Sequence, residues 1–280
     1  MKALVNRIIH TSVVDGPGNR AAIFLQGCNY TCSYCHNPET IHRCVHCGVC
    51  VPVCPTGALT MELDKVVWRE EKCCKCDQCL AACPNMASAK VREYSASEVM
   101  ALLKNDLPFI RGITVSGGEC SLQRDFLLEL FTLAKEKKLT CLMDSNGSYD
   151  YTADAELMAV CDGVMLDVKA WDDGLHRKLT GMGSRMVIDN AVQLAKAGKL
   201  EEIRTVVVPG YLDSEQTVTE ITRLLAPFLE TGSIRYKIIA YRPFGVRQPF
   251  RSQLRVPTAD ELQHLEDIAR RNGFTDIVLI

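Results

Sequence analysis

The sequence has no long apolar run. No stretch approaches the roughly 18 consecutive apolar residues of a membrane-spanning helix. Residues 1–18 carry charges at Lys2, Arg7 and Asp15 where a signal peptide would have its apolar segment. Neither sign of charge is in excess either, since 32 basic and 34 acidic residues give a net charge of -2. We therefore expect a cytoplasmic protein, with neither nucleic acid nor a membrane as its partner.

Cysteine, in contrast, is abundant. The chain has 15 cysteines, and most of them lie in two short zones, residues 28–54 and 73–83. In a chain without an export signal, disulfides would meet a reducing compartment. Binding of a metal ion or an iron–sulfur cluster is therefore the better explanation of these cysteines.

Changes in residue composition and periodicity divide the chain into a main domain, residues 1–43 and 91–280, and an insert, residues 44–90. The insert is dense in Cys, Pro and Lys and has little helical periodicity. It contains an internal repeat, because residues 44–55 resemble residues 73–84. A length of 280 residues suffices for one large domain and a small inserted one.

In the main domain, short apolar runs alternate with amphipathic stretches. The runs predict strands at 21–26, 113–115, 140–143, 164–168, 203–208, 236–240 and 277–279. The stretches predict helices at 97–104, 122–137, 184–197, 214–225 and 258–271, with Ser97 and Ser214 as N-caps. This alternation indicates an α/β fold with a parallel sheet. We expect a partial (β/α)6 barrel whose last run is an edge strand; a doubly wound open sheet is the alternative.

Small and polar residues follow most of these runs. In either architecture, functional groups gather at the carboxyl ends of the parallel strands. The residues at those positions are Cys28, Gly117, Gly118, Glu119, Asp144, Ser145, Asn146, Gly147, Asp167, Lys169, Pro209 and Gly210. Their convergence from separate strands predicts a single site.

Cys28, Cys32 and Cys35 follow the first predicted strand with the spacing Cys-x3-Cys-x2-Cys. Three thiolates can bind three irons of a [4Fe–4S] cluster, which normally takes four cysteines. The fourth iron would then be open to a substrate, as the metal of a catalytic site is. A structural zinc ion held by these cysteines and His36 is the alternative.

The insert contains the bacterial ferredoxin pattern twice, each time ending in Cys-Pro. Because the fourth cysteine of each run serves the other cluster in two-cluster ferredoxins, we assign one [4Fe–4S] cluster to Cys44, Cys47, Cys50 and Cys83 and another to Cys73, Cys76, Cys79 and Cys54. Cys74 is then spare, unless the register shifts to use it. Such clusters transfer single electrons at low potential, although a purely structural role is the alternative in so small a unit.

The triad motif, with the aromatic Tyr34 before its last cysteine, resembles the signature of the radical S-adenosylmethionine (SAM) superfamily. Further motifs resemble one subgroup, the glycyl-radical-enzyme activating enzymes such as pyruvate formate-lyase activating enzyme, and within it the YjjW-type branch with a two-cluster insert. They are VDGPGNR (14–20), QGC (26–28), CHN (35–37), SGGE (116–119), DSNG (144–147), MLDVK (165–169) and RTVVVPG (204–210). The motifs occur in family order over nearly the whole chain outside the insert.

The resemblance implies roles for individual residues. Tyr34 would lie near the adenine of SAM, and Gly117, Gly118 and Glu119 would hold its amino group. The other residues lining the SAM site would be Ser145, Asn146, Asp167, Lys169 and Arg204. A monovalent cation would be held by Asp144, Met165 and Asp167. The partner would be met by the loop of Asp15, Gly16, Pro17, Gly18 and Arg20. Relatives often have Tyr-His where this chain has Tyr241-Arg242, and Arg242 would then replace a histidine that touches the cofactor.

The implied activity is reductive cleavage of SAM at the triad cluster. The resulting 5′-deoxyadenosyl radical would abstract a hydrogen atom from a glycine Cα of a partner glycyl radical enzyme. A flavodoxin or ferredoxin would donate the electron, and we expect a monomer. The sequence leaves two alternatives: a radical SAM enzyme acting on another peptide or small molecule, and a non-enzymatic electron carrier built around the insert.

Overall fold

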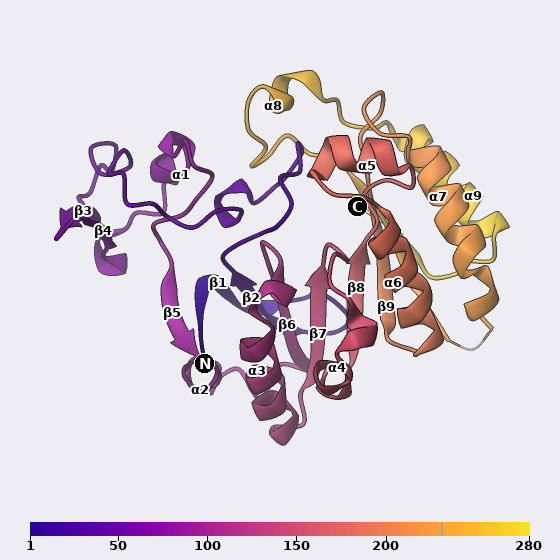
Figure 1. Ribbon diagram of the computed structural model, residues 1–280, viewed down its shortest axis with the longest axis horizontal. Coiled ribbons are helices and arrows are strands. Elements are labelled where there is room, and N and C mark those ends of the chain that lie inside the picture. Colours follow the sequence, from indigo (N-terminus) through magenta and orange to yellow (C-terminus); the bar gives the residue numbers. More distant parts are fainter. Residues whose placement is uncertain (231) are drawn as a thin grey trace.

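The protein is built on one large, mostly parallel sheet (Figure 1). The computed structural model describes residues 1–230 and 232–280. Within them, nine strands pair in the order β11-β10-β9-β8-β7-β6-β2-β1-β5. In that order their bounds are Ile277–Leu279, Arg235–Ala240, Leu200–Val207, Gly163–Asp167, Thr140–Ser145, Gly112–Gly117, Arg20–Leu25, Lys2–Ser12 and Arg92–Ser95.

The predicted α/β class with a parallel sheet is confirmed. Each of the seven predicted runs forms a strand, and from β6 to β11 each strand is added beside the one before it. A doubly wound sheet reverses its strand order at a switch point, whereas this order has no reversal in its parallel part. The sheet stays open, because β11 and β5 are its two edges among the described residues.

Two antiparallel strands were not predicted. β1 pairs antiparallel with both β2 and β5. Only Ala3, Val5 and Ser12 of β1 are buried, and its pairing with β2 shifts register twice. This incomplete alternation of exposed and buried residues explains why the sequence did not reveal the strand.

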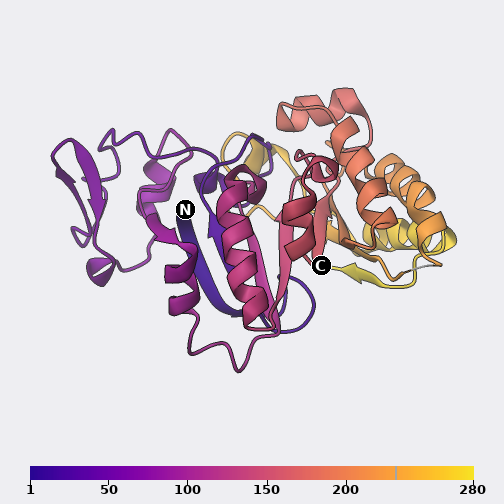
Figure 2. The ribbon, with the colours of Figure 1, turned by 60° about the horizontal axis from the view of Figure 1, so that its bottom comes forward.

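Helices cover one side of the sheet (Figure 2). The bounds of the helices outside residues 44–90 are α2 Ala96–Leu102, α3 Arg124–Glu136, α4 Ala155–Val160, α5 Asp173–Thr180, α6 Arg185–Lys196, α7 Ser214–Leu225, α8 Phe250–Gln253 and α9 Ala259–Arg271, and α8 stands apart from the sheet (Figure 1). The predicted N-caps are wrong. Ser95, not Ser97, caps α2 in a capping box with Glu98, and Asp213, not Ser214, caps α7.

The core lies between the sheet and these helices. All of β2 is buried, and α3 packs Phe126, Leu127, Leu130 and Phe131 against it and its neighbours. Each such side chain contributes about 1.5–3 kcal/mol when it leaves water. No helix among the described residues is long and apolar enough to cross a membrane.

Residues 44–90 project to one side of the sheet (Figure 1). They form a hairpin of β3 (Leu59–Glu62) and β4 (Lys65–Trp68) and one short helix, α1 (Gln78–Ala82). Their apolar core is small and centres on Cys50, Leu59 and Val66. Short 3-10 turns at Pro38–Thr40, Glu70–Lys72, Cys120–Gln123, Tyr151–Ala153 and Ala226–Phe228 complete the described structure.

Candidate active site

A cavity of about 250 Å³ opens at the carboxyl ends of the parallel strands. Most residues predicted for the triad, the cofactor and the cation line it. They are Cys28, Cys32, Tyr34, Cys35, Gly117, Gly118, Asp144, Ser145, Asn146, Asp167, Lys169 and Arg204. The structure thus brings together side chains that lie far apart in the sequence.

The loop that carries the cysteine triad is fixed by backbone hydrogen bonds. Cys28 N–H donates to the Ile41 carbonyl (2.9 Å), and Thr31 N–H donates to the Thr180 carbonyl of α5 (3.0 Å). Burial raises the pKa of the Cys28 thiol to about 11 and that of Cys35 to about 12. The free thiols therefore stay protonated at neutral pH, and a bound cationic metal centre would be needed to hold them as thiolates.

The geometry does not favour a single zinc ion. No three His, Cys, Asp or Glu side chains of residues 1–230 and 232–280 stand close enough together to hold one metal ion. His36, the fourth ligand in the zinc alternative, directs its Nε2 to the Arg242 carbonyl (3.0 Å). His36 Nε2 is thus engaged by the backbone, and both the cluster and the zinc interpretation of the triad stay predictions.

Gly117 and Gly118 let the end of β6 lie directly against the cysteine loop. Gly118 N–H donates to the Leu25 carbonyl (3.0 Å), and Glu119 N–H donates to the Gly27 carbonyl (2.8 Å). A Cβ on Gly118 would stand 2.1 Å from the Gly27 carbonyl oxygen, far inside contact distance. Gly117 has φ +125°, which favours glycine. Both glycines are therefore required by the backbone of the cavity wall.

Glu119 is not among the residues that line the cavity, and its predicted role toward the ammonium of SAM stays a prediction. Its carboxylate is completely buried and accepts hydrogen bonds from Ser121 Oγ (2.6 Å), Ser145 Oγ (2.9 Å) and Asn146 N–H (2.7 Å). Burial raises its pKa, although these donors act in the opposite direction. Glu119 thus supports the turn that places Ser145 and Asn146.

Two cations face the cavity from neighbouring strands. Lys169 Nζ donates to Asp167 Oδ2 (2.8 Å). Arg204 Nη1 donates to Asp144 Oδ1 (2.8 Å), and its Nη2 lies 3.1 Å from Met165 Sδ. Burial alone would lower the pKa of Arg204, but Asp144 and Glu202 raise it above its usual value. Two cations therefore lie in the cavity wall, each paired with a carboxylate of the protein.

The three residues predicted to hold a monovalent cation are in contact with these side chains. Asp144 and Met165 both contact the Arg204 guanidinium, and Asp167 pairs with Lys169. Met165 lies behind the lining of the cavity, fully buried. The negative charge of both aspartates is thus balanced by the protein, and the cation site stays a prediction.

Sequence reasoning missed two charged residues of the sheet interior. Glu202 accepts a hydrogen bond from Arg204 Nε, and its Oε1 lies 3.0 Å from Lys237 Nζ. Both residues are buried. Glu202 lies two residues before Arg204 on β9, and Lys237 lies opposite Arg204 on the neighbouring strand β10. Since side chains alternate along a strand, that spacing was the available signal. Asp144, Arg204, Glu202 and Lys237 form what we call the charge ladder.

The predicted partner loop lies at the opposite end of the sheet from the cysteine triad. It joins β1 to the amino end of β2, where Arg20 pairs with Gly112. Arg20 is 1% exposed and donates to the carbonyls of Ile113 (2.7 Å) and Thr140 (2.9 Å), so its side chain anchors the loop and is not available to a partner. Val13, Val14 and Gly18 are exposed, and the Val14 carbonyl accepts from Lys237 (3.4 Å).

Arg242 does not line the cavity. Its side chain is exposed, and the contact it makes with the cysteine loop is through its backbone carbonyl. Tyr34, in contrast, is buried in the cavity wall, and its hydroxyl has no hydrogen-bond partner within the described residues. Because the hydroxyl is enclosed by protein atoms, it is the rest of the Tyr34 side chain that borders the cavity.

The insert cysteines line two further cavities. One is bordered by Cys44, Cys47, Cys50, Cys79 and Cys83. The other is bordered by Cys54, Cys73, Cys74, Cys76 and Cys79. Each set contains the four cysteines of one crossed assignment. Cys79 borders both cavities, so the two are adjacent, and Cys74 lies at the second.

Comparison with known proteins identifies the class. Residues 22–221 match the model of the radical SAM superfamily. The chain is 31% identical to the pyruvate formate-lyase-activating enzyme of Streptococcus mutans, covering 94% of this chain and 91% of that protein. It is also 31% identical to the (2S)-3-sulfopropanediol sulfolyase activating enzyme of Bilophila wadsworthia, over 84% of this chain and 83% of the relative.

A solved structure agrees in fold. Streptococcus suis SuiB bound to S-adenosylmethionine superposes with a TM-score of 0.54 at 15% identity, over 70% of this chain and 45% of that one. The chain belongs to the radical SAM superfamily and, within it, to the glycyl-radical-enzyme activating enzymes. It is thus a radical SAM enzyme with a [4Fe–4S] cluster and SAM, and a glycyl radical enzyme is its partner. The alternative of a non-enzymatic electron carrier falls with this assignment.

Proposed function

We propose that Cys28, Cys32 and Cys35 hold the cluster that cleaves SAM, and that the cavity beside them is the SAM site. When bound, this pair supplies the 5′-deoxyadenosyl radical that takes a hydrogen atom from a glycine Cα of the partner. The single observation that carries the proposal is the convergence of the triad with Gly118, Asn146, Lys169 and Arg204 on one cavity.

The residues of the cavity fit the parts of SAM. Lys169 and Arg204 offer positive charge to its carboxylate. The backbone at Gly117 and Gly118 can approach its amino group closely because neither residue has a Cβ. Tyr34 lines the cavity with its aromatic side chain and would lie beside the adenine. The protein's own work is to orient these groups and to exclude water.

We further propose that residues 44–90 are a ferredoxin-like insert with two more [4Fe–4S] clusters. The two cysteine-lined cavities support this, because each contains one complete crossed set. The small apolar core of the insert supports it as well, since metal centres commonly stabilise units that cannot bury enough apolar surface. The main domain would then comprise residues 1–43 and 91–280.

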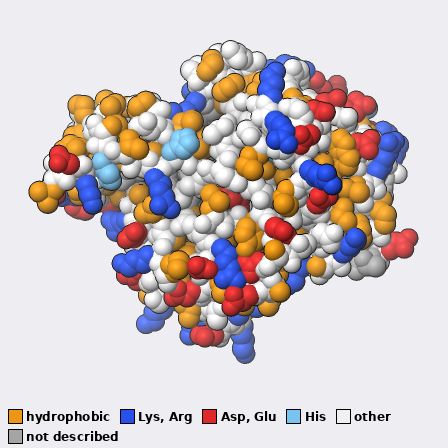
Figure 3. Space-filling model, in the orientation of Figure 1, with side chains coloured by type: hydrophobic (Ala, Val, Ile, Leu, Met, Phe, Trp, Pro, Cys, Tyr) orange, Lys and Arg blue, Asp and Glu red, His pale blue; other side chains and the backbone are white. Residues whose placement is uncertain are grey.

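The remaining partners follow from the class of enzyme. A reduced flavodoxin or ferredoxin would supply the electron in an anaerobic cytoplasm, and the enzyme would act as a monomer in transient complexes. The face drawn in Figure 3 supports a protein partner over a polyanion, because basic and acidic side chains are interspersed on it. Exposed Val13 and Val14 in the loop that contains Asp15 offer apolar surface to the partner.

The test is anaerobic. The reconstituted protein is reduced with dithionite, SAM is added, and 5′-deoxyadenosine is quantified by chromatography. We expect production that requires both the reductant and Cys32. Cleavage retained in Cys32→Ala would refute the triad. For the insert, Cys47→Ala or Cys76→Ala should lower iron below the twelve or so per chain of three clusters while SAM binding persists; unchanged iron would refute the cluster assignment.

A further inference from the structure

Residues 241–247 contact both cysteine-rich parts of the protein, the triad loop and the insert, and we call this segment the strap. It leaves the end of β10 and leads to α8. On one side it contacts the residue that follows Cys35. The Arg242 carbonyl accepts from His36 Nε2 (3.0 Å), and Gly245 lies so close that a Cβ on it would be 2.1 Å from the His36 carbonyl oxygen.

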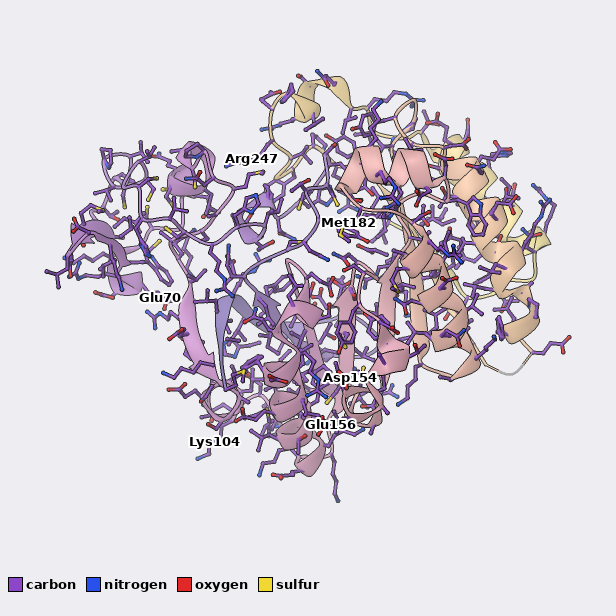
Figure 4. The ribbon with its side chains drawn as sticks, viewed as in Figure 1. Glu70, Lys104, Asp154, Glu156, Met182 and Arg247 are labelled. Carbon is purple, nitrogen blue, oxygen red and sulfur yellow. The ribbon has the colours of Figure 1, made fainter. Side chains whose placement is uncertain are left out.

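On its other side the strap reaches the insert through Arg247. Its Nη2 donates to the carbonyl oxygens of Leu80 (3.2 Å) and Cys83. Both carbonyls lie at the C-terminal end of α1, which Cys83 caps. Figure 4 shows Arg247 between the insert and the chain segment that leads to α8. Both acceptors are uncharged, and Arg247 makes no ion pair with residues 1–230 or 232–280, so its positive charge lies beside the Cys83 carbonyl without a carboxylate partner there.

Cys83 belongs to the insert cavity that adjoins the catalytic one. Ile41 lines the catalytic cavity. The next residue, His42, forms a parallel bridge with Ala87, which lines the insert cavity that contains Cys83. The other insert cavity contains neither Cys83 nor Ala87. The strap therefore contacts the nearer of the two insert sites.

We infer that Arg247 is a positioning residue for the cluster ligated by Cys83, and that its charge raises the reduction potential of this cluster. The inference rests on the proposed presence of clusters in the insert. An added electron makes a cluster more negative, so a nearby cation stabilises the reduced state more than the oxidised one. Hydrogen bonds and charge around the ligating cysteines set such potentials. Arg247 comes from the main domain, so the main domain adjusts a cluster in the insert.

The experiment is a redox titration followed by electron paramagnetic resonance. It uses the full chain with Cys28, Cys32 and Cys35 changed to Ser, so that the signals of the insert clusters are seen alone. Arg247→Gln keeps a donor for the carbonyls but removes the charge, and Arg247→Lys keeps the charge. Arg271→Gln, at an exposed arginine at the end of α9, is the matched control.

We expect Arg247→Gln to lower the reduced-to-oxidised ratio of one insert cluster about tenfold at a fixed potential, a shift of about 59 mV for one electron. Arg247→Lys should retain most of the wild-type potential, and Arg271→Gln should retain all of it. Unchanged midpoints in an Arg247→Gln protein with full iron would overturn the inference. If Arg247→Gln and Arg247→Lys both bound less iron than the parent protein, the inference would also be overturned.

Iron content separates this inference from the proposed function. The background without the triad should bind about eight irons per chain, four for each remaining cluster. A background that binds none would refute the insert clusters and, with them, the role of Arg247. About eight irons with equal potentials in all variants would refute the role of Arg247 alone.

Discussion

Glu202 holds two buried cations of the sheet interior, and its replacement by glutamine tests the charge ladder directly. Its carboxylate accepts from Arg204 Nε and pairs with Lys237 Nζ at 3.0 Å. Glutamine has the same shape but no charge, and it presents an N–H₂ group to one of the two donors. Arg204 would keep Asp144, whereas Lys237 would keep the Val14 carbonyl at 3.4 Å.

The expected loss follows from the burial of these charges. Two opposite charges 4 Å apart interact by about 4 kcal/mol at an effective dielectric constant of about 20. The variant loses this attraction, but it also no longer has to bury the charge of Glu202, which offsets part of the loss. Removing one partner of a buried ion pair costs about 3–5 kcal/mol. At about 2–4 °C per kcal/mol for large domains, we expect Tm to fall by roughly 6–20 °C.

The assay compares Tm and SAM affinity of anaerobically reconstituted proteins. Glu201→Gln is the matched control, because Glu201 is the preceding carboxylate on the same strand and only half-buried. We expect Glu201→Gln to stay near wild type and Glu202→Gln also to bind SAM more weakly, since Arg204 loses a side chain that fixes its orientation. Equal Tm values for the two variants would refute the energetic role of the ladder.

Three further changes test the cavity wall and its support. Gly118→Ala should abolish SAM binding in a calorimetric titration, because its Cβ would stand 2.1 Å from the Gly27 carbonyl oxygen; wild-type affinity would contradict this account. Glu119→Gln should weaken SAM binding about tenfold by loosening the turn of Ser145, a loss of about 1–3 kcal/mol in hydrogen bonding, with Glu136→Gln, at the exposed last residue of α3, as control. Burial lowers the pKa of His176, so folding favours its neutral ring. The contribution of this ring to stability is fully present above the unfolded pKa, which is near 6.5. It is lost progressively as the pH drops from there toward the lowered pKa of the folded state. His176→Gln should flatten this part of the Tm profile, measured between about pH 5 and 8.

The sequence located the parallel strands and most of the cavity for one physical reason. A buried strand is a local apolar run, and the residues that follow it must meet at one edge of a parallel sheet. Thus Gly118, Asn146 and Lys169 could be assigned to one cavity before any contact was known. The N-caps failed because capping residues are clustered: Ser95 and Ser97, like Asp213 and Ser214, compete within three positions. The Glu98 partner of Ser95 was the signal that decides the first case.

What could not be predicted depends on which way a side chain points. A motif places Glu119 beside the cofactor in sequence, but its burial beneath Ser145 and Asn146 depends on how β6 and β7 pack. Arg20 likewise belongs to a loop motif, yet its hydrogen bonds reach strands 93 and 120 residues away. Such long-range contacts leave no trace in local periodicity.

The way the insert is attached explains how one chain can carry it without disturbing the catalytic cavity. The chain leaves the main sheet after Leu25, enters the insert just past His42 and comes out of it near Ala87 before β5, and His42 and Ala87 form a parallel bridge. Bridged strands lie about 5 Å apart, so the whole insert closes on itself over one strand spacing. β5 then pairs with β1, while β2 and β6 remain direct neighbours over Arg20–Leu25. The entropic cost of closing the insert as a loop grows only slowly with its length. The two ends of the insert meet at the His42–Ala87 bridge, outside the β2–β6 contact whose strands lead to Cys28 and Gly118. The strap contacts both the residue after Cys35 and, through Arg247, the carbonyl of Cys83, which is why Arg247 and not the length of the insert is the place to test whether the main domain adjusts a cluster in the insert.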